Sequence, residues 1–289
     1  MKKVVILGCE NSHADSFLKS IAEKQEFSDV SVLGIYSDER AAAEKLSERF
    51  GVPIMEHYAD GAGKVDGVII TARHGDNHLK YALPYIESGV PMFIDKPITA
   101  SEDDVVELMK RLTDANTKFC GGSSLKQDDV VKQLAQERKN TENGKTLGGF
   151  IRTPYSKENN YGGFSFYAQH LVEMVCEIFG RFPLSVYATE GEGTVNVIFN
   201  YGDFSCCGLY CNENYLYYAS LMTEKKAISQ TITDSSPWFY REFSEFYELL
   251  SGGEQKISAR EFASPVFIIN AIERSLKSGK EEGVKRLEF

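Results

Sequence analysis

Short apolar runs alternate with longer amphipathic stretches through the first part of the chain. Apolar residues recur at helical spacing in the segments 14–23, 39–50, 77–88 and 102–116, which predicts four helices. Strands and helices that alternate at these lengths predict a parallel sheet with right-handed crossovers, a Rossmann-type domain. Five apolar runs between the helices are typical of buried strands: Val4–Leu7, Val30–Tyr36, Asp66–Thr71, Met92–Ile94 and Thr117–Cys120.

The pattern changes after Gly121-Gly-Ser-Ser124, which we interpret as the hinge between two domains, 1–122 and 123–289. Helices are predicted at about 128–139, 166–179, 238–250 and 259–278, with a strand near 148–153. Strand alternation at 185–190, 194–201, 204–211, 215–222 and, more weakly, up to 233 predicts an antiparallel meander. The expected fold class is therefore α/β, with a Rossmann domain followed by an α+β domain that has a mainly antiparallel open sheet.

Length, charge and cysteine content narrow the class of protein. The 289 residues suffice for two domains with separate cores. A net charge of −10 argues against nucleic acid or an anionic membrane surface as a partner, and no apolar stretch approaches bilayer-spanning length. The six cysteines include no Cys-x-x-Cys pair, which is typical of reduced thiols in a cytoplasmic protein. Cys9 lies in a candidate ligand-binding turn, so a reactive thiol there is an alternative.

Two segments carry candidate catalytic groups. Lys96 follows an apolar strand and precedes Pro97, at the carboxyl end where open α/β sheets bind ligands. The alternative is a surface lysine in a strand-to-helix turn. The helix at 166–179 places His170, Glu173 and Glu177 on one face, and the alternative there is a solvated polar face.

The sequence Asp95-Lys96-Pro97 resembles the Glu-Lys-Pro motif of the glucose–fructose oxidoreductase / inositol dehydrogenase / rhizopine-catabolism (Gfo/Idh/MocA) family. The segment from Asp66 through His78 to Gly89 resembles that family's fourth strand and following helix, and the likeness extends from Val4 to about Gly279. It implies an oxidoreductase that transfers a hydride between NAD or NADP and a sugar, polyol or related hydroxy compound.

The same resemblance implies roles for individual residues. Lys96 and His170 are expected to be catalytic, with His170 as general base and Lys96 bonded to the reacting oxygen. Relatives carry an Asp four residues before the His, where this chain has Phe166, so Tyr167 or Glu173 is a candidate to orient His170 and contact the substrate. The cofactor is expected at Gly8, Cys9, Asn11, Ser12, His13, Ser37, Asp38, Arg40, Thr71, Ala72, His78, Asp95 and Lys96.

The turn after the first strand departs from the dinucleotide fingerprint Gly-x-Gly-x-x-Gly/Ala, because it reads Gly8-Cys-Glu-Asn-Ser-His13. Either Glu10 points outward while Asn11, Ser12 and His13 supply donors, or the site has decayed in a non-catalytic sugar- or nucleotide-binding regulatory relative. Transient use of the dinucleotide, as in some glycosidases of the family, is a third reading. Ser12 and Asp15 also fit a helix-capping box.

The end of the second strand leaves the choice between NAD and NADP open. Ser37 aligns with the family's usual acid, so Asp38 could serve NAD or Arg40 could serve NADP. No metal is expected, because His74 and His78 have helical zinc spacing without an HExxH pattern or a third ligand. The Gly144-Lys-Thr146 end of a P-loop-like stretch lacks the loop's first glycine.

Assembly is predicted from the strands of the second domain. Both faces of 194–201 and its neighbours carry Tyr, Cys, Leu or Ile, and monomers rarely expose so much apolar surface. Open sheet faces of this kind pair across two-fold axes in the resembled family, which implies a homodimer or homotetramer. A monomer whose outer sheet face is wetted by Tyr and Asn is the alternative.

Overall fold

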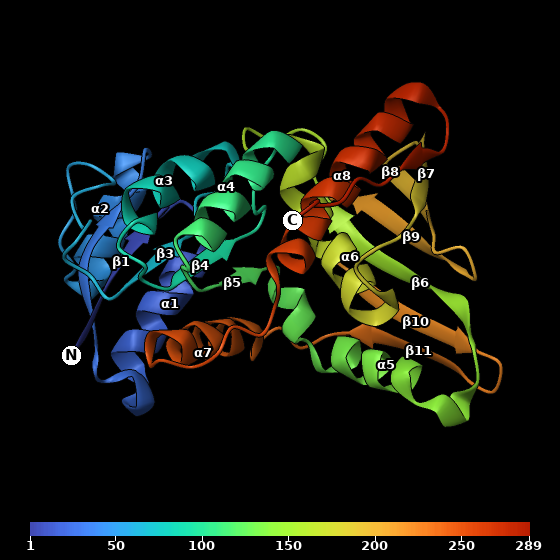
Figure 1. The fold of residues 1–289 in the computed structure, drawn as a ribbon, viewed down its shortest axis with the longest axis horizontal. Coiled ribbons are helices and arrows are strands. Elements are labelled where there is room, and N and C mark those ends of the chain that lie inside the picture. The colour runs from blue at the N-terminus through green and yellow to red at the C-terminus, as the bar shows by residue number, and fades with distance from the viewer. The chain divides into compact units, whose positions relative to one another are not determined.

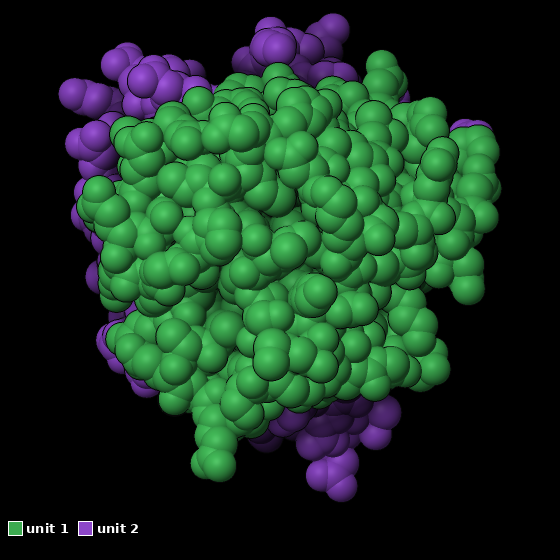
Figure 2. Space-filling view, turned by 90° about the vertical axis from the view of Figure 1, so that its left-hand side faces the viewer, with its two compact units in different colours: residues 1–122, 239–259 green, residues 123–238, 260–289 purple.

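The computed structural model describes residues 1–289, which form two compact units. Unit 1 comprises residues 1–122 and 239–259, and unit 2 comprises 123–238 and 260–289 (Figure 2). The sequence places 239–259 in the second domain, whereas in the structure helix α7 (Trp238–Leu250) belongs mainly to unit 1. Phe243 and Phe246 of α7 are fully buried in the core of that unit. An apolar helix stripe predicts burial without indicating which core receives it.

Unit 1 is a five-stranded parallel sheet in the order β2-β1-β3-β4-β5. Its strands are β1 (Lys2–Leu7), β2 (Val30–Tyr36), β3 (Gly67–Ile70), β4 (Met92–Asp95) and β5 (Phe119–Gly122). A single parallel bridge from Ile35 to Ile54 stands beside β2, where a Rossmann sheet has a further strand. The strand order changes direction between β1 and β3, so the carboxyl ends of these two strands mark the expected ligand site.

Helices cover both faces of this sheet (Figure 1). They are α1 (Ser12–Glu23), α2 (Arg40–Phe50), α3 (Asp76–Ile86) and α4 (Glu102–Asp114), with a 3-10 turn, η1, at Gln25–Phe27. α3 and α4 pack together on one face, while α1 and α7 cover the other. Phe17 of α1 contacts Phe93 of β4 and Phe243 of α7, which ties the sheet to both helices.

Unit 2 is a seven-stranded mixed sheet in the order β11-β10-β6-β9-β8-β7-β12. Its strands are β6 (Thr146–Tyr155), β7 (Ser185–Gly191), β8 (Thr194–Asn200), β9 (Ser205–Asn212), β10 (Tyr217–Thr223), β11 (Ala227–Ile232) and β12 (Glu282–Gly283). β6 and β9 run parallel, and the other neighbouring pairs are antiparallel. Because β6 inserts between β9 and β10, the strands do not form the predicted continuous meander. Alternation of apolar and polar residues indicates a strand but not the strand with which it pairs.

One face of the unit 2 sheet is covered by α5 (Asp129–Lys139), α6 (Phe164–Phe179) and α8 (Ala259–Ser278) (Figure 1). Two 3-10 turns, η2 (Ser124–Gln127) and η3 (Thr141–Asn143), flank α5. The alternation predicted for β8 is confirmed, because Val197 and Phe199 are buried under the helices and Ile198, on the other face, is 44% exposed. None of the helices combines the length and apolar composition that a bilayer-spanning segment needs.

Candidate active site

The candidate residues fall into two groups, one in each unit. In unit 1, β4 ends at Asp95, Lys96 follows directly, and the Lys96–Pro97 peptide bond is cis. β4 lies between two other strands and under helices, so the residues at its end are buried, Asp95 completely and Lys96 to 5% exposure. Burial lowers the pKa of Lys96 to about 8, although the Asp95 carboxylate opposes the shift. The surface-lysine alternative is therefore wrong.

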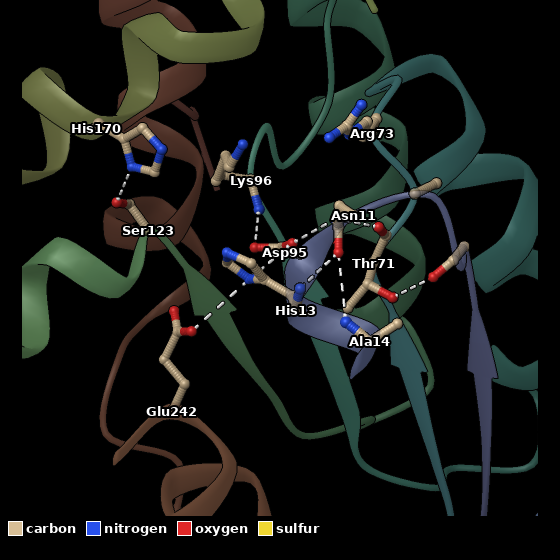
Figure 3. Close-up of polar contacts among 12 residues, drawn as sticks. Asn11, His13, Ala14, Thr71, Arg73, Asp95, Lys96, Ser123, His170 and Glu242 are labelled. Atoms are coloured by element: carbon tan, nitrogen blue, oxygen red, sulfur yellow. Dashed lines mark hydrogen bonds and ion pairs between the residues drawn. The ribbon is translucent and has the colours of Figure 1, made fainter. Parts of the chain in front are cut away.

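Asp95 joins the end of β4 to the turn after β1 (Figure 3). Its Oδ1 accepts a hydrogen bond from the Lys96 backbone N–H at 2.7 Å. Its Oδ2 accepts from Asn11 Nδ2 at 3.3 Å and lies 2.9 Å from His13 Nδ1. Burial disfavours the carboxylate, but the neighbouring His13 and Lys96 outweigh it and hold the pKa of Asp95 below its ordinary value.

His13 lies between Asp95 and Glu242, a residue of α7. The imidazole is buried in the first turn of α1, with its Nδ1 3.8 Å from Glu242 Oε2 and its ring against Phe239. Glu242 is not among the residues predicted from the sequence. A signal was present, because Glu242 is an acid on the same helical face as Phe239 and Phe246, and a charge on an apolar face is costly unless it has a partner.

The turn after β1 is held against the end of β3. Gly8 has a φ of 101°, and a Cβ there would lie 2.1 Å from the backbone nitrogen of Ala72, so only glycine fits. Thr71 is buried and donates from Oγ1 to the Gly8 carbonyl at 2.6 Å. Three of the predicted cofactor residues, Gly8, Thr71 and Ala72, thus build the turn through close backbone approach.

Asn11 is the N-cap of α1, so the predicted capping box beginning at Ser12 is wrong. The Asn11 side-chain oxygen accepts from the backbone N–H groups of His13 at 2.8 Å and Ala14 at 3.3 Å. Its Nδ2 donates to the Thr71 carbonyl at 2.5 Å, and Ser12 itself is exposed. Asn11 is fixed by partners on both sides, from β3 and β4, and such long-range partners are not visible in a local capping motif.

Glu10 does not point outward. Its Oε2 accepts a hydrogen bond from Ser37 Oγ at 2.6 Å, and its Oε1 accepts from the Arg73 backbone N–H at 2.9 Å. Ser37 follows the last residue of β2, and Arg73 lies in the loop after β3. The Glu10 carboxylate is therefore held between the ends of two strands, which corrects the outward-pointing interpretation.

The other predicted residues near β2 have partners of their own. Asp38 accepts from the Tyr36 hydroxyl at 2.7 Å and lies 3.5 Å from Lys80 Nζ. Arg40 is exposed and forms ion pairs with Glu44 and Glu56, each at 3.5 Å. Cys9 is buried with its thiol toward the Tyr36 carbonyl, and burial raises the pKa of that thiol to about 12, so a reactive thiolate is excluded near neutral pH.

His78 lies in the first turn of α3, and its side chain is fully buried rather than on the surface. Its Nε2 lies 2.8 Å from the Ala72 carbonyl and therefore carries the proton. Burial lowers the pKa of His78, so the ring is neutral near pH 7. In this arrangement His78 supports the loop after β3 next to Ala72.

In unit 2, His170 is buried on α6, and its Nδ1 lies 2.7 Å from Ser123 Oγ (Figure 3). α6 is apolar on nearly every side because it lies between the sheet and the other helices, so a polar residue on it needs a partner. From the sequence, Ser123 is predicted only as part of a hinge. The contact between Ser123 and His170 joins residues 47 positions apart, so no local sequence pattern indicates it.

The remaining candidates on α6 have structural partners. The Glu173 carboxylate accepts from Gln169 at 3.1 Å and pairs with Arg181 at 3.3 Å, and Arg181 also pairs with Glu177. The alternative of a solvated polar face is therefore wrong at Glu173, which is 1% exposed. The ring centroid of Tyr167 lies 5.8 Å from that of His170, so Tyr167 is a direct neighbour of the imidazole.

The fold and the turn after β1 define unit 1 as a dinucleotide-binding domain. The parallel sheet, the close turn at Gly8 and a helix that begins directly after it are the features of such a domain. The Asn11 side chain already caps the His13 and Ala14 amides, so a bound diphosphate would face the turn and the start of α1 without these two donors. Lys96 follows the end of β4, which pairs with β3, so it lies at the same carboxyl edge of the sheet. The residues present therefore fit such a cofactor.

Residues 2–122 match the model of the oxidoreductase family with an NAD-binding Rossmann fold, the Gfo/Idh/MocA family. This match confirms the resemblance over residues 2–122, which correspond to the NAD-binding domain of that family. Among curated proteins, none matches the chain.

Solved structures of similar fold cover nearly the whole chain. Myo-inositol 2-dehydrogenase from Lactobacillus plantarum has 13% identity and a TM-score of 0.82, covering 98% of this chain and 99% of its own. Scyllo-inositol dehydrogenase from Lactobacillus casei, with bound NAD(H) and scyllo-inositol, has 14% identity and a TM-score of 0.81 over 98% and 99%. Myo-inositol dehydrogenase from Corynebacterium glutamicum has 14% identity and a TM-score of 0.80 over 99% of both chains. At these identities the likeness shows a shared fold.

Proposed function

We propose that this protein is a dehydrogenase or reductase that transfers a hydride between NAD or NADP and a CH–OH group of a sugar, polyol or related compound. The observation that carries the proposal is the buried, cationic Lys96 at the end of β4 in an NAD-binding domain. Burying a lysine costs stability, and such a group is a candidate for function. The fold is shared with three inositol dehydrogenases, which supports a polyol as substrate.

The proposed chemistry uses His170 and Lys96. A bound nicotinamide would supply the acceptor for the hydride that leaves the carbinol carbon. His170 takes the hydroxyl proton, and Lys96 donates a hydrogen bond to the oxygen as negative charge develops on it. For His170 to accept a proton at Nε2, its Nδ1 must carry hydrogen, and Ser123 Oγ at 2.7 Å can accept that hydrogen bond. Ser123 thus acts as the positioning residue in place of the Asp lost at Phe166.

Turnover of NAD or NADP with inositols and hexoses, followed by nicotinamide absorbance, tests this proposal. Lys96→Ala and His170→Ala should each lower kcat/KM by about 100- to 10,000-fold, the usual contribution of a positioned acid–base group. Lys110→Ala, which removes an exposed lysine on α4, is the matched control. If substrate is turned over at the wild-type rate by both site variants, the assignment is wrong.

We further propose that the protein acts in the cytoplasm as a homodimer or homotetramer. None of the six cysteines forms a disulfide, which suits a reducing compartment. The uncovered face of the unit 2 sheet carries apolar side chains with substantial exposure, among them Ile198 and Met222. A second copy of the chain is the partner that the family resemblance suggests for this face.

A further inference from the structure

Two departures from the dinucleotide-binding pattern are joined by one hydrogen bond. Position 10, where the pattern requires glycine, carries an acid, and position 37, where an acid is usual, carries serine. The Ser37 hydroxyl donates to Glu10 Oε2 at 2.6 Å. The carboxylate missing at the end of β2 is therefore supplied to the same place by the turn after β1.

The Glu10 carboxylate is fixed but not saturated. Ser37 Oγ and the Arg73 backbone N–H each occupy one acceptor site, and a carboxylate has about four. Ser37 is 6% exposed and its hydroxyl also accepts from the Glu39 backbone N–H, so it holds Glu10 in place. Glu10 is half-buried, which leaves part of its carboxylate accessible.

The charged residues near the end of β2 interact with side chains other than Glu10. Asp38, the other acid at the end of β2, accepts from the Tyr36 hydroxyl and lies near Lys80. Arg40, the cation that could neutralise a 2′-phosphate, is paired with Glu44 and Glu56. Glu10 is thus the acid best placed to accept hydrogen bonds from a ligand at the ends of β1 and β2.

We propose that Glu10 binds the adenosine ribose hydroxyls of the dinucleotide and makes the protein selective for NAD over NADP. This inference rests on the proposed function. A carboxylate accepts hydrogen bonds from the 2′- and 3′-hydroxyls, whereas it repels the doubly charged 2′-phosphate of NADP. Ser37 is then a positioning residue. Its hydroxyl donates a hydrogen bond to the Glu10 carboxylate, whereas an ionised acid at position 37 would repel that carboxylate.

Fluorescence titration with NADH and NADPH measures this selectivity without turnover. The wild type should bind NADH at least about tenfold more tightly than NADPH, the effect of one close like-charge contact. Glu10→Gln should weaken NADH binding by about 10- to 100-fold, as for loss of a hydrogen bond to a charged group, and should not weaken NADPH binding. Glu39→Gln removes an equal charge from an exposed neighbour and should change neither Kd more than about twofold.

A double variant tests whether the acid at position 10 replaces the one usual at position 37. Glu10→Gly combined with Ser37→Asp restores the usual residues at these two positions and should recover NADH selectivity, whereas Glu10→Gly alone should lose it. Tighter NADH binding by Glu10→Gln, or loss of selectivity in Asp38→Asn instead, would overturn the role of Glu10 while leaving the oxidoreductase proposal standing. Failure of the wild type to bind either nucleotide would overturn the proposed function itself.

Discussion

Single buried charges define the unit 1 part of the candidate site. Asp95 is completely buried yet ionised, because His13, Asn11 and the Lys96 backbone surround its two oxygens. Replacing either partner of such an arrangement leaves the other charge without compensation. The sequence Asp-Lys-Pro identifies the end of the strand, but the burial of its charges depends on α1 and α7, which contribute His13 and Glu242.

Lys96 should reduce the stability of the folded protein at neutral pH. Its pKa is about 8 in the folded protein against an ordinary value of 10.5, so folding disfavours the charged form. Below pH 8 Lys96 is charged in both states and the cost is complete. Between about 8 and 10.5 the unfolded state binds more protons, so stability rises with pH until the cost has vanished.

Lys96→Met should therefore raise the free energy of unfolding at pH 7 by up to about 3 kcal/mol, while lowering kcat/KM as Lys96→Ala does. The gain should shrink between pH 8 and 10.5, as measured by urea unfolding across that range. Lys110→Met, at an exposed position, should show no such dependence. A Lys96→Met gain that stays constant up to pH 10.5 would show that the pKa of Lys96 is not lowered.

At the scale of elements, α1 begins where contacts from other strands fix its cap. Asn11→Ala removes the acceptor for the His13 and Ala14 amides and the donor to Thr71, so it should lower the free energy of unfolding by about 1–3 kcal/mol. Ser12→Ala, one residue later and exposed, should change it by less than about 0.5 kcal/mol. Denaturant unfolding without nucleotide measures both, and equal effects would contradict Asn11 as the N-cap.

At the scale of the whole molecule, the uncovered sheet face of unit 2 bears on assembly. Tyr187, Ile198 and Met222 on β7, β8 and β10 are 39%, 44% and 49% exposed. Register places Ile198 beside the exposed Cys207 of β9, so apolar side chains continue across neighbouring strands. Contiguous apolar surface of this kind is typical of interfaces.

Light scattering should give a multiple of the 32.4 kDa chain mass for the wild type. Ile198→Asp combined with Met222→Lys should shift the protein toward 32.4 kDa, because charges at an interface core are costly to desolvate. Val106→Asp, at an exposed apolar position on α4, should leave the mass unchanged. A wild-type mass near that of one chain at high concentration would exclude the oligomer.

The order of elements was readable from local sequence, because hydrophobic periodicity and turn residues act over a few positions. α7 and α8 begin and end where the sequence predicts them, and β2 does as well. Lys96 and His170 could be selected because a strand-end motif and a family resemblance mark them. Whether both act in catalysis stays a prediction.

Only the tertiary structure decided which distant residues meet. The insertion of β6 between β9 and β10 and the packing of α7 in unit 1 depend on pairing and burial across the chain. Glu242 beside His13, Ser123 beside His170 and Glu10 beside Ser37 are likewise contacts between residues that lie 27 or more positions apart. A local pattern fixes backbone conformation, whereas a carboxylate's partner is fixed by where the folded chain brings a donor.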